Sequence, residues 1–120
     1  YAWDEMMAYE TTPGSQGLCP PGWHVPTESE WTILFSQYVN NGFAASPLKY
    51  SGYSGFSALL QGVRVHNRDY IFKGFATFLW TSNPLGQRKA WAHGMNDPDP
   101  SVSSYPAYRS NTFGVRCLRD

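Results

Sequence analysis

The sequence predicts a single α+β domain, and three of its features support that class. A strong helix signal occupies residues 28–39, and short strand-like runs separated by turn residues fill residues 57–118. The two cysteines, Cys19 and Cys117, enclose most of the chain. Helices followed by a run of strands are typical of α+β domains. A chain of 120 residues usually forms one domain with a core of its own.

Residues 1–9 predict the first, short helix. Asp4 and Glu5 suit its first turn, where the helix dipole favours negative charge. The apolar residues that can share its faces are Ala2, Met6 and Tyr9 on one side and Trp3 and Met7 on another. A polar loop over residues 10–18 follows this helix.

The second helix has a clear start and an apolar face. Thr27 followed by Glu30 is a capping-box pattern, in which Thr27 is the N-cap residue. We therefore expect a helix from Glu28 to Val39, ended by the asparagines and glycine of residues 40–42. Its apolar stripe, which we expect to face the core, consists of Trp31, Leu34, Phe35 and Tyr38.

The rest of the chain predicts strands and turns. Apolar, β-branched and aromatic runs predict strands over residues 57–65, 70–72, 77–81, 89–94, 102–108 and 113–118. We expect a turn over Asn83–Gly86 and a loop over Asn96–Pro100, because the prolines there do not fit a sheet interior. Pro106 marks residues 102–108 as an edge strand, which the proline interrupts.

We interpret the two cysteines as a disulfide. Two cysteines without nearby histidines are too few for a zinc site, and the chain has no CxxC motif. A catalytic thiol is the alternative, but neither Cys19 nor Cys117 has a convincing partner close to it in sequence. A bond between them would join the stretch around Cys19 to the last residues of the chain and close the fold.

The composition argues against several classes of protein. The formal net charge is zero, whereas nucleic-acid-binding domains usually carry a basic face. No apolar run is long enough to cross a bilayer, so we expect no membrane insertion by this domain. Aromatic residues make up 17% of the chain and charged residues 15%. Many aromatic residues and turns with few charges favour an extracytoplasmic domain with an aromatic surface.

Three stretches of the chain resemble motifs of one family. Cys19–Trp31, with the sequence CPPGWHVPTESEW, looks like the CPxGWHxP(S/T)xxEW signature of the Fibrobacter succinogenes major paralogous domain. Gly55–Leu59, GFSAL, looks like the central motif of that family, and Phe113–Asp120 resembles its closing VRC(L/V)RD motif. Weaker similarities lie in the first helix, at Trp80–Ser82 and at Ala90–Trp91. The resemblance spans essentially all 120 residues.

The resemblance implies a fold and a location. Members occur in surface and secreted proteins of Bacteroidetes and Fibrobacteres, and the domain is similar to C-type-lectin-like and sulfatase-modifying-factor-like folds. Two helices packed on twisted antiparallel β-sheets are therefore expected, with the N- and C-terminal regions close together, in an extracellular or cell-surface protein. Members usually carry a further segment before the first helix. We thus expect this chain to be part of a larger surface protein or to have one open sheet edge.

The sequence offers little support for catalysis or a cofactor. A sulfatase-modifying-type enzyme, the remote alternative, needs reactive cysteines, and the chain has no phosphate-binding loop, HExxH motif or GxSxG motif. His24 is expected to bond to the backbone. We therefore expect no enzymatic activity, no cofactor and no metal. Asn96, Asp97 and Asp99 offer oxygen ligands for calcium, but the calcium motifs of lectins are absent from the sequence. A plain asparagine, aspartate and proline turn is the expected structure there.

The aromatic and polar residues around the late strands are the predicted binding site. Aromatic faces stack on sugar rings, and planar polar groups bind hydroxyls. In the C-type-lectin-like folds that the resemblance implies, ligands usually meet the loops between the late strands. The alternative is that these aromatic residues belong to the core. The candidate ligand-binding residues are Trp91, His93, Asn96, Asp97, Asp99, Tyr105, Tyr108 and Arg109.

We therefore expect a cell-surface binding or adhesion module whose ligand is a glycan or a host or partner protein. The main alternative is a structural terminal module of a surface appendage, such as a pilus or fimbria. Its partners would be other subunits of the appendage, and it would need no small-molecule site.

Overall fold

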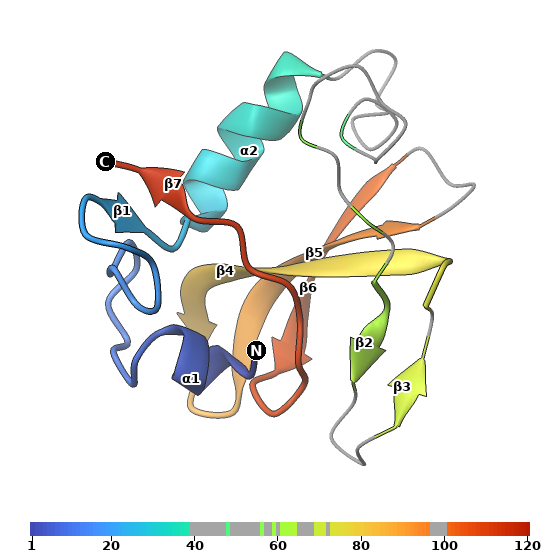
Figure 1. Ribbon diagram of the computed structural model, residues 1–120, viewed down its shortest axis with the longest axis horizontal. Helices are drawn as coiled ribbons and strands as arrows, with labels where there is room; N and C mark the ends of the chain where they lie inside the picture. The colour runs from blue at the N-terminus through green and yellow to red at the C-terminus, as the bar shows by residue number, and fades with distance from the viewer. Residues whose placement is uncertain are drawn as a thin grey trace.

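The computed structural model of the chain describes residues 1–38, 48, 56, 59, 61–64, 69–71, 73–96 and 101–120. Its elements, in chain order, are α1 (Trp3–Met6), β1 (Trp23–His24), α2 (Glu28–Gln37), β2 (Val63–Arg64), β3 (Tyr70–Ile71), β4 (Ala76–Leu85), β5 (Lys89–Asn96), β6 (Val102–Tyr108) and β7 (Leu118–Arg119). Figure 1 shows α1 and the start of α2 beside the later part of β4, and β2 and β3 beside its beginning. The fold is α+β, as predicted.

The centre of the domain is a three-stranded antiparallel sheet in the order β4-β5-β6. Lys89 of β5 pairs with Leu85 of β4 on one side and with Tyr108 of β6 on the other. Two short antiparallel pairs accompany this sheet, β1 with β7 and β2 with β3. Residues 57, 58, 60 and 65 of the strand predicted over residues 57–65 lie outside the described residues, and β2 is the part of the remainder that forms a strand.

Strand β4 is longer than the sequence predicts. The turn expected over Asn83–Gly86 is instead the end of the strand, and the reversal occurs over residues 86–88. The register of the β4–β5 pair shifts between Trp80 and Pro84, as it does at a β-bulge. The bulge lets the strand continue past Pro84, whose missing N–H would otherwise interrupt the ladder.

Two side chains and one carbonyl group satisfy the main-chain groups that the bulge leaves without a ladder partner. The Thr81 hydroxyl donates a 2.9 Å hydrogen bond to the carbonyl of Trp91. The indole N–H of Trp3 donates to the Thr81 carbonyl at 2.8 Å, and the Ser82 N–H donates to the Pro26 carbonyl at 2.8 Å. Thr81 and Ser82 are fully buried. The bulge thus attaches α1 and the segment before α2 to the sheet.

Pro106 does not interrupt β6, contrary to the prediction. It lies opposite Trp91, within the strand Val102–Tyr108. Residues of antiparallel strands alternate between pairs that exchange main-chain hydrogen bonds and pairs that do not. A proline fits the second kind, with its nitrogen directed to the outer edge. Because β6 is an edge strand of the described sheet, as predicted, this position requires no N–H donor.

Helix α1 is shorter than the predicted helix over residues 1–9. Ala8 and Tyr9 have positive φ angles of 52° and 64°, which a continuing right-handed helix does not allow. Trp3 and Met6 are fully buried, whereas Tyr9 is 77% exposed. The predicted apolar face is therefore wrong at Tyr9, because the chain changes direction before that residue can join the face.

Helix α2 confirms the predicted helix start. The Thr27 hydroxyl accepts from the Glu30 N–H at 3.2 Å, and the Glu30 carboxylate accepts from the Thr27 N–H at 2.7 Å. This reciprocal pair is the capping box. Trp31 is 2% exposed, and the other stripe residues pack against its cluster: Leu34, Phe35 and Tyr38. Residues 39–42, which include the predicted helix end, lie outside the described part of the chain.

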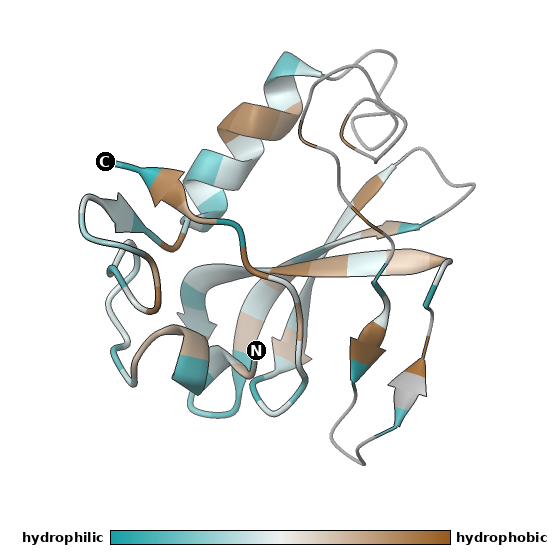
Figure 2. Cartoon of the chain, in the orientation of Figure 1, coloured by the Kyte–Doolittle hydropathy of each residue, from teal (hydrophilic) through white to brown (hydrophobic). Residues whose placement is uncertain are grey.

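The buried apolar residues form two clusters. The larger contains Trp3, Trp80 and Phe113, with the ring centres of Trp80 and Phe113 lying 4.3 Å apart. The smaller lies under α2 and contains Trp31 and Leu79. Figure 2 shows apolar segments, in brown, in the middle of α2 and along β4. Strand β4 therefore contributes to both clusters.

The two ends of the fold are joined as predicted. Cys19 and Cys117 form a disulfide, with their Cα atoms 5.9 Å apart. Beside the disulfide β1 pairs with β7, and Trp23 lies opposite Arg119. Disulfides persist in oxidising compartments, so the bond indicates a domain that functions outside the cytoplasm.

Candidate functional site

The described residues of the loops predicted to bind ligand lie at two different ends of β5. The loops after β4 and β6 are neighbours, because the Arg109 N–H donates to the Arg88 carbonyl at 2.9 Å. Asn96 closes the opposite end of β5. That strand has eight residues, so its ends lie roughly 24 Å apart. Asp97 and Asp99 lie outside the described residues.

Two of the predicted binding residues are packed inside the fold. His93 is 2% exposed, and its ring meets that of Phe35 edge-on, with centroids 4.8 Å apart. Tyr105 is half-buried against Phe78, with centroids 5.8 Å apart. Burial raises the pKa of the Tyr105 hydroxyl. Both side chains therefore have a packing role.

Arg109, another predicted site residue, is held by contacts to α1, to β5 and to the turn between β4 and β5. Its Nη1 donates to the Asp4 carboxylate at 3.1 Å. Its Nε and Nη2 donate to the carbonyls of Lys89 and Gly86 at 3.1 and 2.6 Å. The guanidinium carbon lies 4.3 Å from the centre of the Trp3 ring. Arg109 thus attaches α1 to the β4–β5 hairpin, a role suited to its planar group of donors.

The other described members of the predicted set lie at or near the surface. Tyr108 is 50% exposed, with Nζ of Lys89 4.9 Å from the centre of its ring. Trp91 is half-buried in β5, and Asn96 is exposed at the far end of that strand. Within the described part of the chain, the predicted residues therefore do not gather into one site.

A polar cluster beside the start of α2 lacks the arrangement of a catalytic triad. Nε2 of His93 lies 3.1 Å from Oε2 of Glu28, and the Ser104 hydroxyl donates to Oε1 of Glu28 at 3.0 Å. Burial lowers the pKa of His93, although Glu28 opposes the shift. Activation of a serine nucleophile needs an imidazole on its hydroxyl, whereas here the carboxylate holds it. The cluster ties α2 to β5 and β6.

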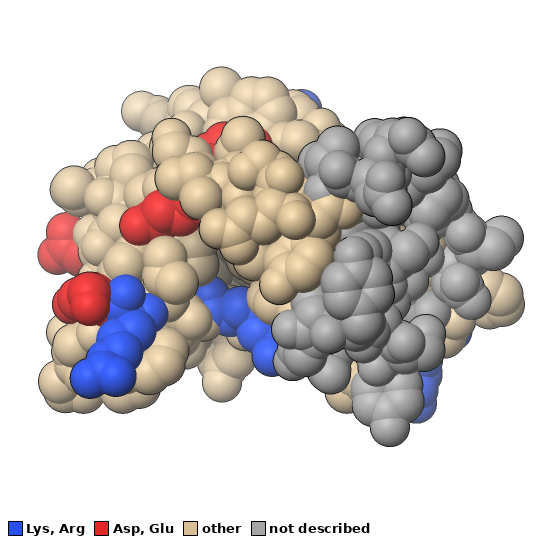
Figure 3. Space-filling model, turned by 90° about the horizontal axis from the view of Figure 1, so that it is seen from above, with Lys and Arg blue, Asp and Glu red and all other residues tan. Residues whose placement is uncertain are grey.

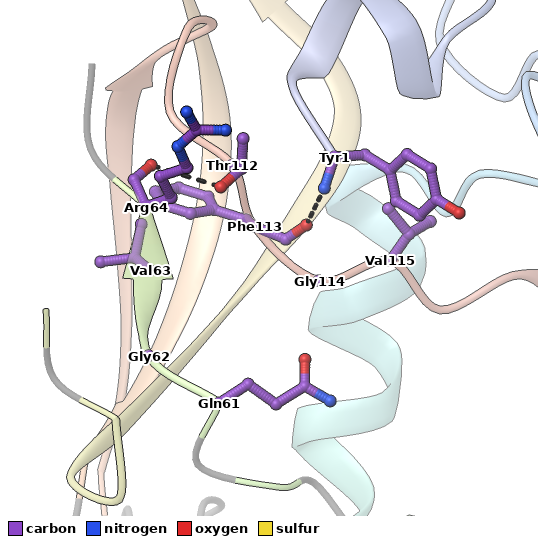
Figure 4. Close-up of a pocket in the computed structure, with 9 residues that line it drawn as sticks. All are labelled: Tyr1, Gln61, Gly62, Val63, Arg64, Thr112, Phe113, Gly114 and Val115. Atoms are coloured by element: carbon purple, nitrogen blue, oxygen red, sulfur yellow. Dashed lines mark hydrogen bonds between the residues drawn. The ribbon is translucent and has the colours of Figure 1, made fainter. Parts of the chain in front are cut away.

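A hollow of about 360 Å³ lies between the first residue, the beginning of β2 and the segment before β7. Figure 4 shows Tyr1 beside Val115 on one wall. Val63 and Arg64 stand opposite, and the Gln61 side chain extends into the space between the walls. We call this site the Tyr1 hollow. Its lining residues are Tyr1, Gln61, Gly62, Val63, Arg64, Thr112, Phe113, Gly114 and Val115.

Two glycines bring the walls of the Tyr1 hollow onto one edge of β4. The Gly114 N–H donates to the Phe78 carbonyl at 2.9 Å, and its carbonyl accepts from the Trp80 N–H at 3.1 Å. A Cβ at position 114 would lie 3.1 Å from a methyl carbon of Leu79, a tight contact. The Gly62 N–H likewise donates to the carbonyl of Ala76, the first residue of β4, at 2.8 Å. Both segments are therefore fixed by main-chain bonds.

Several polar and aromatic groups of the Tyr1 hollow are available to a ligand. No hydrogen bond joins the Gln61 side-chain amide to another described residue. The Thr112 hydroxyl makes a long bond of 3.4 Å to the Arg64 carbonyl. The Tyr1 side chain is 63% exposed. The hollow thus combines an aromatic face with amide and hydroxyl groups.

The sequence gives little warning of this site. Its residues come from three distant stretches that meet through β4, and a search along consecutive strand loops misses them. One usable signal is a glycine within each of two predicted strands, Gly62 and Gly114, because glycine in a strand often marks close approach of another backbone.

Neither a metal site nor a membrane span is found in the described part of the chain. Among those residues, no group of three histidines, cysteines, aspartates or glutamates is placed to hold a metal ion. No described helix has the length and apolar character needed to cross a membrane.

His24 connects the beginning and the end of the domain. Its Nδ1 lies 2.6 Å from Oδ1 of Asp120, and its Nε2 lies 2.9 Å from Oε1 of Glu30. The expectation of bonds to the backbone is therefore wrong, because two carboxylates bind this ring.

Comparison with known protein families gives a match: the family model of the Fibrobacter succinogenes major domain matches residues 1–119 of the chain. The chain belongs to this family.

In this Fibrobacter succinogenes major domain, the first and last motifs have clear structural roles. The stretch Cys19–Trp31 supplies one half of the disulfide, strand β1 and the capping box of α2. The stretch Phe113–Asp120 supplies the other half, strand β7 and the carboxylate on His24. No curated protein and no solved structure matches the chain.

Proposed function

We propose that this domain is a non-enzymatic binding module of a cell-surface or secreted protein, with a C-type-lectin-like fold, and that it recognises a glycan. The proposal rests on the Tyr1 hollow, a space of about 360 Å³ that has Tyr1, whose side chain is exposed, on one wall and the unpaired planar amide of Gln61 between its walls. Small-molecule sites commonly have volumes of about 300–1,000 Å³. The hollow replaces the late-strand loops as the proposed site, since Tyr108 and Asn96, two described residues of those loops, lie at opposite ends of β5.

The groups of the Tyr1 hollow suit the chemistry of a sugar. The ring of Tyr1 offers an apolar face against which the C–H side of a sugar ring can stack. The Gln61 amide supplies two donors and one acceptor, and Thr112 supplies a hydroxyl. Sugar hydroxyls are both donors and acceptors, so each of these groups can bind one.

The charge of the domain as a whole favours a neutral glycan, and among the described residues that line the Tyr1 hollow Arg64 has the one charged side chain. The formal net charge is zero. On the face shown in Figure 3, most of the described surface carries neither acidic nor basic side chains, and those present stand in small groups. A strongly charged polymer is usually bound by a surface of one sign, which attracts it over a distance.

Three described residues with potentially reactive side chains, Cys19, Cys117 and Ser104, are bonded to other residues of the domain. Cys19 and Cys117 are bonded to each other, so neither supplies the thiolate expected of a sulfatase-modifying-type enzyme. The Ser104 hydroxyl is bonded to a carboxylate. These contacts support a binding role over a catalytic one.

The first test is a glycan-array screen with and without calcium, followed by calorimetry on each glycan that binds. Gln61→Ala should weaken binding about tenfold, because it removes hydrogen bonds worth roughly 1 kcal/mol each. Tyr1→Ala should weaken it by a similar factor through loss of stacking. The matched controls are Gln37→Ala and Tyr9→Ala, which change exposed residues outside the hollow. Both controls should bind normally, and calcium should make no difference.

Other outcomes would point to other functions. If Tyr108→Ala weakens binding and Gln61→Ala does not, the site lies at the late-strand loops. Binding to a host protein with no array signal would favour a protein ligand. Self-association that depends on concentration, again without glycan binding, would favour the structural subunit of a surface appendage.

A further inference from the structure

Two smaller hollows follow the Tyr1 hollow along the segment that leads to β7. The second, of about 50 Å³, lies beside Gly114–Arg116, and the third, of about 110 Å³, lies beside Arg116–Leu118. The second shares Gln61 with the Tyr1 hollow and Arg116 with the third. Figure 1 shows this segment, in red, passing in front of β4 before it reaches β7. The three hollows thus lie in sequence along one extended piece of chain.

We propose that the three hollows form one binding site, the C-terminal groove, which holds a linear, neutral glycan chain along the segment Thr112–Leu118. This inference rests on the proposed function and extends it to a ligand class. Six residue steps of extended chain span roughly 20 Å, which is too long for one sugar ring. The groove therefore recognises an internal stretch of a chain, and a single terminal sugar fills only part of it.

The main-chain bonds of the groove favour a glycan over an extended peptide. The Thr112 N–H donates to the Arg64 carbonyl and the Gly114 N–H to the Phe78 carbonyl, both at 2.9 Å. Phe113 exchanges two hydrogen bonds with the first residue of the chain, at 3.1 and 2.8 Å. A peptide that adds as a strand needs such groups to be vacant. A glycan binds through side chains and ring faces and does not need them.

The third hollow adds a different kind of surface to the groove. Trp31 and Leu34 of α2 line it together with Phe56, and the Arg116 guanidinium carbon lies 4.8 Å from the centre of the Phe56 ring. The buried indole N–H of Trp31 has no hydrogen-bond acceptor among the described residues. Apolar walls with a spare donor suit a sugar ring, whose faces carry C–H groups and whose rim carries hydroxyls.

The groove is held in shape before any ligand arrives. Gly114 is bonded to β4 through both its N–H and its carbonyl. Cys117 is fixed by the disulfide, and Leu118 begins the strand that pairs with β1. A fixed wall loses little conformational entropy when a ligand binds, which favours affinity for a chain of matching length.

The length of the ligand tests the groove separately from the proposed function. Titration calorimetry would use cello-, xylo-, manno- and chitin oligosaccharides, each as disaccharide, tetrasaccharide and hexasaccharide. In at least one series the hexasaccharide should bind about tenfold more tightly than the disaccharide. Equal affinity for both lengths would overturn the groove and leave the glycan-binding function standing. No binding by any of these sugars or by the array would overturn both.

Variants at the two ends of the groove test whether a long glycan occupies both ends and a short one only the Tyr1 hollow. Gln61→Ala should weaken binding of disaccharide and hexasaccharide alike, whereas Arg116→Gln should weaken the hexasaccharide severalfold and leave the disaccharide unchanged. Arg119→Gln, an exposed arginine that does not line any of the three hollows, is the control. In the wild-type protein, the NMR resonance of the Trp31 indole N–H should shift when the hexasaccharide is added and should not shift when the disaccharide is added. A resonance that does not move with any chain length would show that ligand stays out of the third hollow and would overturn the groove.

Discussion

His24 links the two ends of the domain by charge as well as by position. The hydrogen bond to Asp120 is the main cause of its raised pKa; burial opposes the shift and Glu30 adds to it. The pKa of Glu30 is lowered, because its bonds to Thr27 and His24 outweigh the effect of burial. A protonated His24 therefore stabilises the junction of β1, β7 and α2.

Stability should consequently depend on pH through His24. A histidine with a raised folded-state pKa contributes its full stabilisation below its unfolded pKa of about 6.5 and loses it as the pH rises through the folded value. We expect the difference in unfolding free energy between wild type and His24→Gln to shrink as the pH rises from about 6.5, the unfolded value, through the raised folded-state pKa. Urea denaturation at a series of pH values measures it. The opposite contribution of His93, whose pKa burial lowers, is present in both proteins and cancels. A difference that stays constant with pH would contradict the role given to His24.

Trp31 and Thr27, at the start of α2, should contribute different amounts to the unfolding free energy. Trp31 is 2% exposed in the core, so Trp31→Ala should cost ~3–5 kcal/mol of unfolding free energy through the cavity it leaves. Thr27→Ala removes one side of the capping box and should cost about 1 kcal/mol. Chemical denaturation of both variants, with Ser36→Ala on the exposed face as control, gives the comparison. Equal losses for Trp31→Ala and Thr27→Ala would show that the stripe of α2 does not face the core.

The bulge in β4 is the element on which the other elements converge. The N–H of Glu28, in the first turn of α2, donates to the Asn83 side chain at 2.8 Å, and the Gly14 N–H donates to the Ser82 hydroxyl at 2.9 Å. The Trp3 indole N–H donates to the Thr81 carbonyl as well. These three bonds join the bulge to three segments of the first 28 residues, all distant from β4 in sequence. The short stretch Trp80–Ser82, a weak motif in the sequence, has a clear structural role.

Removing the Thr81 hydroxyl should therefore be costly. Thr81→Val keeps the shape of the side chain but leaves the Trp91 carbonyl and the Asn83 N–H without the bonds they now make. We expect a loss of about 2–4 kcal/mol, since each unsatisfied buried group costs roughly 1–3 kcal/mol. Thr32→Val, on the exposed side of α2, should change stability by less than ~0.5 kcal/mol. If urea denaturation finds the two substitutions equally mild, the bulge is not held by that hydroxyl.

Local signals explain what the sequence predicted well. The capping box lies within four consecutive residues, Thr27–Glu30, and it fixed the start of α2 correctly. The end of β4 was predicted too early because its bulge depends on Trp3 and Pro26, which are distant in sequence. Pro106 was expected to interrupt β6 because the sequence does not show which way its nitrogen points.

The candidate site was harder to predict for the same reason. Aromatic residues near late strands indicated a binding surface, but His93 and Tyr105 pack inside and Arg109 binds Asp4. The Tyr1 hollow forms where Gly62 and Gly114 bond to the same edge of β4. Sequence periodicity describes one element at a time and does not contain this contact.

At the scale of the whole molecule, the disulfide should contribute much of the stability. It joins residues 98 positions apart. Closing a loop of that length stabilises a fold by ~4–5 kcal/mol in the chain-entropy model. The double variant Cys19→Ser, Cys117→Ser should lose about that much unfolding free energy in denaturant. Alkylation of the unreduced, unfolded wild-type protein should leave its intact mass unchanged, and two modified thiols would show that the bond is absent in solution.

The position of the disulfide also sets how the domain responds to mechanical tension. Force applied to the two ends can extend residues 1–18 and 118–120, because the residues between Cys19 and Cys117 are enclosed by the bond. That is roughly 70 Å of extension, against roughly 400 Å for the whole chain without the bond. Tyr1 lies in the extensible part, whereas Gln61, Gly114 and Arg116 do not. Pulling would therefore draw Tyr1 out of the Tyr1 hollow and Leu118 out of the third hollow, so that tension weakens the proposed groove at its two ends and leaves its middle in place.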